Sequence, residues 1–220
     1  MERTSSTRTI GLGLAVYGLG NVVGFAASGS PGGNYKNADV SRYISSSHFW
    51  AASACWYLVA LSALGLVVAA SALEHRLAAS LMRLGAGCAV VGSFISGGLA
   101  VAMAEGGATV RAGVPHAVVY AITEVGNLVA VCAPALFVGA AALLLAAAGA
   151  MPRGLRSVTF VAGIFGILAP FFFTYFAFIL WALVAGAVWA LRGRRGPGTS
   201  SRPDGEFVSV ARDTAAATLD

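Results

Sequence analysis

The sequence predicts an all-α, polytopic transmembrane helix bundle of six spans, with both termini in the cytoplasm. Hydrophobic residues make up 58% of the chain and charged residues 10%, and the mean hydropathy is +0.80. A soluble domain carries about 25% charged residues, so this chain cannot cover itself with a hydrated surface. Its apolar residues form blocks of about 18 or more between short charged stretches, the pattern expected when lipid is the solvent.

Each apolar block is assigned to a span by the polar residues that bound it. A polar stretch with Arg3 and Arg8 precedes the first span, and a charged connector over 74–83 separates the second from the third. Two adjacent glycines and Pro115 indicate the loop before the fourth. The spans cover about residues 10–27, 49–73, 83–104, 117–149, 155–169 and 172–191, within a membrane domain of residues 1–195.

Two segments near the N-terminus leave room for other interpretations. Residues 25–28 could pass for the cleavage site of a signal peptide, but the first apolar run is long enough to span and further spans follow it. Residues 29–47 form the first outer loop, and its second part could be a short interfacial helix capped by Asp39.

Two prolines shape the last apolar blocks. Span four is long, and we expect Pro134 to bend it. A single helix over 157–191 would be far longer than a bilayer core of about 30 Å. Pro170 divides this block, so we expect a short fifth span, a tight turn at Pro170-Phe171, and a sixth span.

The distribution of basic residues supports six spans, because Lys and Arg accumulate on the cytoplasmic side of short loops. Six spans leave only Lys36, Arg42 and Arg111 outside. Five spans would export the Arg192–Arg195 cluster with the whole tail. The residues placed inside are Arg3, Arg8, Arg76, Arg83, Arg153, Arg156, Arg192, Arg194, Arg195, Arg202 and Arg212.

The rest of the composition indicates which membrane holds the protein and how its C-terminal tail behaves. One lysine among fourteen basic residues, with abundant Ala and Gly, is typical of a high-GC bacterium, so we expect the bacterial cytoplasmic (inner) membrane. The tail over 196–220 is rich in Gly, Pro, Ser and Thr and is expected to be disordered.

The net charge of +5 follows the loops and forms no basic patch, so we expect no nucleic-acid partner. No motif indicates a cofactor, and Cys55, Cys88 and Cys132 show no redox or zinc spacing.

Polar residues inside the spans concentrate in their outer halves. Ionisable residues in spans are costly and usually face the bundle interior, which makes Glu124 the first candidate. Tyr120, Glu124 and Asn127 follow one another at helical spacing on one stripe of span four, below His116. Tyr17 and Asn21 form a similar stripe on span one. Ser93 and Ser96 lie in span three, and Thr174 and Tyr175 open span six.

This asymmetry allows two interpretations. The stripes could line a polar pocket that is open to the outside, with Glu124 and Asn127 near its floor. Alternatively, the same groups hold the bundle together by hydrogen bonds between helices, worth about 0.6 kcal/mol each. The spacing of Gly20 and Gly24, and glycines in other spans, indicates close helix packing.

A metal site at the outer helix ends is a weaker hypothesis. His48, Glu105 and His116 offer imidazole and carboxylate ligands that suit zinc, which could activate water against a lipid-like substrate. They come from separate loops with no metal-binding spacing. We therefore expect that they do not bind a metal together.

The layout resembles uncharacterised six-helix integral membrane proteins of actinobacteria. The resemblance is carried by the segment from Tyr43 to His48 before span two, by Met151-Pro152-Arg153, and by the last span with its ending Trp189 to Arg195. No activity is assigned to that group, so no functional residue is carried over from it.

The sequence favours a non-enzymatic membrane bundle embedded in the lipid bilayer. It would bind or pass a small solute, or serve as an accessory subunit with other membrane subunits or further copies of itself. A membrane-embedded enzyme that acts on a lipid-like substrate at the outer face is the alternative. No nucleophile arrangement or phosphate-binding loop supports that alternative.

Overall fold

The computed structural model describes residues 2–28, 41, 48–148, 153–171 and 173–192. These residues contain helices and no strand. The interfacial segment at Asp39 and the tail over 196–220 lie outside them. The helical elements are α1 (Glu2–Ser28), α3 (Phe49–Ser62), α4 (Leu64–Ser71), α5 (Arg76–Glu105), α6 (Gly107–Gly113), α7 (His116–Asn127), a π-helical turn η1 (Leu128–Cys132), α8 (Ala133–Ala147), α9 (Arg153–Ile167), a 3-10 turn η2 (Ala169–Phe171) and α10 (Phe173–Arg192).

Four stretches of the described chain are long and apolar enough to cross a membrane. They are Phe49–Ser71, Arg76–Glu105, His116–Ala147 and Thr174–Leu191, and Gly154–Ile167 is a shorter apolar helix. Large apolar side chains such as Leu19, Phe94 and Leu180 are more than half exposed. Water would penalise such a surface, whereas hydrocarbon does not.

The third long helix begins earlier than the sequence suggested. Residues 76–83 were expected in a connector, but α5 starts at Arg76, where Nδ1 of His75 accepts from the Ala78 amide at 3.2 Å. Buried Ala78 and Met82 continue the apolar face through this region, while Arg83 stays exposed. Long arginine side chains can reach the headgroup layer from the end of a spanning helix, so charge alone did not mark the helix boundary.

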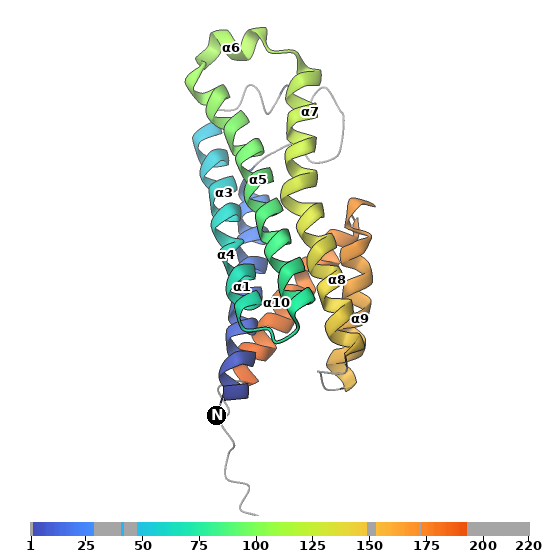
Figure 1. Cartoon of the computed structure of the whole chain (residues 1–220). Coiled ribbons are helices and arrows are strands. Elements are labelled where there is room, and N and C mark those ends of the chain that lie inside the picture. Colours follow the sequence, from blue (N-terminus) through green and yellow to red (C-terminus); the bar gives the residue numbers. More distant parts are fainter. Residues whose placement is uncertain (1, 29–40, 42–47, 149–152, 172, 193–220) are drawn as a thin grey trace, which may run out of the picture.

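The expected loop between the third and fourth long helices contains the short helix α6. Gly107 is its first residue and lies in the left-handed region with φ 61°. Arg111 donates to the Met103 carbonyl at 3.0 Å, and its guanidinium lies 5.5 Å from the centre of the Phe49 ring. These contacts fasten α6 over the ends of α3 and α5 (Figure 1).

A π-helical turn divides the longest helical run just before Pro134. Proline lacks an amide hydrogen, and its ring clashes with the carbonyl four residues earlier. The chain widens locally, so that the Ala133 amide bonds to the carbonyl of Leu128. Pro134 then occupies the first turn of α8, where its missing donor costs least.

The helices pack in a closed order around the interior. α1 lies between α3 and α4 on one side and α10 on the other, while α5 joins α3 and α4 to α7 and α8. α9 packs on α8 and α10. The first and last helices of the chain are therefore neighbours (Figure 1).

Glycines allow several of these helices to approach one another closely. A Cβ on Gly13 would collide with the carbonyl oxygen of Gly65, and one on Gly92 would collide with the backbone of Ala130. Gly139 lies in the same way against the backbone of α9. Small residues at such positions favour helix association in membranes because van der Waals contact drives it.

Candidate functional site

Asn21 is the centre of a hydrogen-bond cluster between α1, α3 and α10. Its side chain is 1% exposed. The Oδ1 atom accepts from the Tyr175 hydroxyl at 3.0 Å, and Nδ2 donates to the Tyr17 carbonyl at 2.9 Å. Nδ2 also lies 3.5 Å from the Ser62 hydroxyl, which donates to Val59. The cluster ties three helices together in a region that excludes water.

Tyr17 lies one turn before Asn21 and is fully buried. Its hydroxyl has no hydrogen-bond partner among the described residues. It lies within electrostatic range of the Cys132 thiol, and so does the Tyr175 hydroxyl. Tyr17, Tyr175 and Cys132 belong to the same buried core cluster.

Glu124 and Asn127 come from α7. Glu124 is half-buried and interacts electrostatically with Cys132. Asn127 is 4% exposed, and neither its amide nitrogen nor its amide oxygen has a partner in the described chain. The Glu124 carboxylate likewise has no hydrogen bond or ion pair with a described residue.

We call these groups the interior polar array: Tyr17, Asn21, Glu124, Asn127, Cys132 and Tyr175. Tyr17, Cys132 and Tyr175 share one buried core cluster, and Glu124 lies within electrostatic range of Cys132. The array contains one carboxylate and no basic residue. It can therefore accept hydrogen bonds from a cationic or polar group and donate few in return.

The unpartnered groups of the array carry an energetic cost. A buried donor or acceptor without a partner costs about 1–3 kcal/mol, and an apolar surrounding raises that cost. The Tyr17 hydroxyl and the Asn127 amide together present several such groups. Each would be stabilised by a ligand that supplies the matching hydrogen bond.

Tyr120 lies one helical turn before Glu124 on α7. Its ring packs against a smaller apolar cluster toward α6, formed by Phe49, Leu99, Met103 and Val119 with two alanines. The predicted residues Tyr17 and Asn21 lie in the interior. Asn21 bonds to Tyr175, and no hydrogen bond joins it to Glu124 within the described chain.

The three residues of the weaker metal hypothesis lie at the α6 end of the bundle. His48 precedes α3, Glu105 ends α5 and His116 begins α7, and all three are exposed. In the part of the chain that the structure describes, no three His, Cys, Asp or Glu residues gather closely enough to hold a metal ion.

Sequence reasoning did not assign Tyr175, Ser62 or Cys132 to the site. A signal for Tyr175 existed, because a tyrosine in an apolar run usually finds a partner for its hydroxyl. Cys132 was considered for redox or zinc spacing, and it ends the π-helical turn in the buried core. Ser62 ends α3, where its hydroxyl also bonds to the preceding helical turn.

Three cavities are lined by described residues elsewhere in the bundle. One lies between α3 and α5, beside Tyr57 and Phe94, and another lies between α1 and α3, beside Leu19 and Leu58. Both have mostly apolar walls on the lipid-facing side. The third lies at the end of the bundle where α1 begins. No protein-family model, curated protein or solved structure matches this chain.

Proposed function

We propose that the chain is a six-span protein of the bacterial cytoplasmic membrane with both termini inside. In this arrangement α1 and α9 are the two further spans beside the four long apolar stretches. The exposed residues Arg8, Arg76, Arg83 and Arg156 lie near helix ends on one side of the bundle, and Arg111 lies in α6 on the other. This partition is what the positive-inside rule expects of six spans.

We further propose that the interior polar array binds a small cationic or polar solute that enters from the α6 side. One observation carries this proposal: the Tyr17 hydroxyl and the Asn127 amide are buried without partners in the described chain, and Glu124 lies one turn before Asn127 on α7. Intramembrane carboxylates commonly belong to solute or ion pathways. A purely structural cluster would instead pair its donors and acceptors, as Asn21 and Tyr175 do.

The composition of the array favours a cation or an amine. Glu124 supplies negative charge, and the amide and hydroxyl oxygens of Asn127 and Tyr17 supply acceptors. An anion would meet the carboxylate with no compensating basic group in the array. Apolar residues on every side keep the local dielectric low, which strengthens attraction to an ion that has entered.

The proposal is tested with the purified protein in lipid nanodiscs. Thermal unfolding is measured with Na⁺, K⁺, ethylamine, choline or glucose at increasing concentration. A ligand that binds only the folded state at 100 times its Kd adds about 2.7 kcal/mol. We expect a cation or an amine to raise the Tm of the native protein.

Three variants determine whether that response depends on the array. Glu124→Gln removes the charge but keeps the shape, and Asn127→Leu removes the amide. Glu105→Gln removes an exposed carboxylate at the α6 end and serves as the matched control. Loss of the response in the first two variants alone supports binding at the array. If all variants respond equally, or no solute stabilises the protein, the interhelical or accessory-subunit role replaces solute binding.

A further inference from the structure

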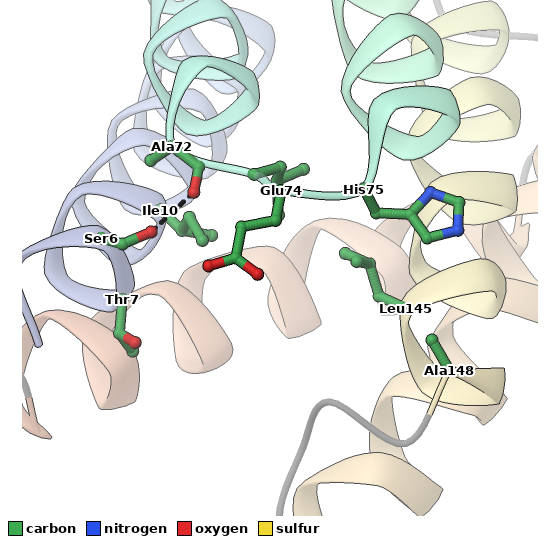
Figure 2. A pocket seen from close by; sticks show the side chains of 9 residues that line it. Ser6, Thr7, Ile10, Ala72, Glu74, His75, Leu145 and Ala148 are labelled. Carbon is green, nitrogen blue, oxygen red and sulfur yellow. Dashed lines mark hydrogen bonds between the residues drawn. The ribbon is translucent and has the colours of Figure 1, made fainter. Parts of the chain in front are cut away.

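A second polar site lies at the end of the bundle that carries the exposed arginines. A cavity of about 570 Å³ is bounded by the start of α1, the connector between α4 and α5, and the end of α8. Figure 2 shows Glu74 directing its carboxylate into this space between Ser6 and Leu145. Small-molecule sites occupy about 300–1,000 Å³, so the cavity can hold a compact ligand.

Among the described residues that line the cavity, Glu74 is the one carboxylate. It makes no ion pair or hydrogen bond with any described residue. The imidazole of its neighbour His75 is turned away from it (Figure 2), and Nδ1 of that ring accepts from the Ala78 amide. The carboxylate is therefore available to an incoming positive charge.

Two helices direct their carbonyl ends toward the same cavity. α4 ends at Ser71, and its C-cap residue Ala72 lines the wall, as does Ala148 at the C-cap of α8. Helix C-termini carry a partial negative charge and favour cations. The Ala72 carbonyl accepts from the Ser6 hydroxyl at 2.6 Å, which fixes the start of α1 against this end.

The rest of the wall suits a ligand with an alkyl part. Ile10, Leu73 and Leu145 add apolar side chains to the lining, and Thr7 is also part of it. Arg8 and Arg76 follow wall residues directly in the chain and are exposed. A phosphate attached to an amine could therefore meet an arginine outside the cavity while the amine lies inside.

We propose that this cavity binds a primary ammonium group with a short alkyl chain. The acceptors in the wall are a carboxylate and helix C-termini, which match the three donors of an ammonium. Two sources share this chemistry: the ethanolamine headgroup of a phospholipid and a soluble amine such as spermidine. The site is separate from the interior polar array and does not depend on it.

The two sources are distinguished with the full-length protein. Lipid retention is measured by native mass spectrometry after exchange into equal parts phosphatidylethanolamine, phosphatidylcholine and phosphatidylglycerol. A thermal shift with spermidine is measured separately in phosphatidylcholine nanodiscs. Glu74→Gln is compared with the native chain, and Glu105→Gln is the control acid at the opposite end.

We expect preferential retention of phosphatidylethanolamine or a spermidine-induced shift, and we expect Glu74→Gln to weaken either by about tenfold. Retention of the lipid alone assigns the headgroup as the ligand, and a shift with spermidine alone assigns the soluble amine. The trimethylammonium of phosphatidylcholine has no N–H donor and should not compete. Equal retention of all three lipids without a spermidine shift would overturn the proposal, as would a preference that survives Glu74→Gln.

Discussion

The hydroxyl of Tyr175 donates to Oδ1 of Asn21 at 3.0 Å and joins the last helix of the chain to the first. Both side chains are buried, at 2% and 1% exposure. Because both side chains are buried, the Tyr175 hydroxyl and the Oδ1 atom of Asn21 satisfy each other in place of water.

Removing this bond should destabilise the bundle modestly. Hydrogen bonds between membrane helices average about 0.6 kcal/mol and reach about 1.7 kcal/mol. We expect Tyr175→Phe to lower the free energy of unfolding within that range, and a double-mutant cycle with Asn21→Leu to show a coupling of similar size. Denaturation in mixed micelles measures both. Tyr57→Phe changes an exposed ring and is the control. Strict additivity of the two changes would show that the bond contributes nothing.

Gly92 should tolerate no larger side chain. A Cβ there would overlap the backbone of Ala130, whereas one on Gly98 of the same helix meets nothing within 4 Å. We expect Gly92→Leu to cost about 1–3 kcal/mol or to prevent folding, and Gly98→Leu to stay within about 0.5 kcal/mol. Monodispersity by size-exclusion chromatography and thermal unfolding report the difference. Equal tolerance at the two sites would contradict the close approach of α5 and η1.

Pro134 should maintain the register between α7 and α8. Replacing it with alanine restores an amide donor, so the wide turn can close into an ordinary α-helix. An α-helical turn holds one residue fewer than the wide turn. Closing the wide turn therefore rotates α7 relative to α8 by about 100°. Spin labels at the exposed positions Val118 and Ala147 should then change their separation, as measured by pulsed EPR. Pro115→Ala at the N-cap of α7 should leave that separation unchanged.

The orientation of the chain can be measured in cells. Six spans place Lys36 outside and a reporter fused after Arg195 inside. A phosphatase reporter should therefore be inactive at the C-terminus, and a fluorescent protein that folds only in the cytoplasm should be bright there. A cysteine at position 36, with the native cysteines replaced, should react with a membrane-impermeant maleimide. An externally active reporter after Arg195 would rule out six spans.

The sequence predicted the helical class and the general location of the polar side chains for separate physical reasons. Apolar blocks long enough to span a bilayer require helices, because lipid offers no partner for a free backbone amide. The polar stripe over Tyr17 and Asn21 predicted an inward face because polar groups avoid hydrocarbon.

Other features depend on packing that the sequence does not encode locally. Asn21 and Tyr175 are 154 residues apart, so their hydrogen bond requires the complete fold. Pro134 predicted a bend in the long helix but not that the bend would be a π-helical turn. That turn sets how α7 is rotated relative to α8. The start of α5 was missed because Arg76 and Arg83 lie on an exposed face at the helix end, where charge is tolerated.

The contact between the first and last helices has a consequence for synthesis at the ribosome. α1 is translated long before α10, so the Oδ1 atom of Asn21 has no Tyr175 donor until the chain is almost finished. The glycine-lined face of α1 likewise remains uncovered until Gly186 reaches it. A nascent chain interrupted before α10 would therefore retain an unpaired Asn21 amide oxygen and an uncovered helix face at Gly11.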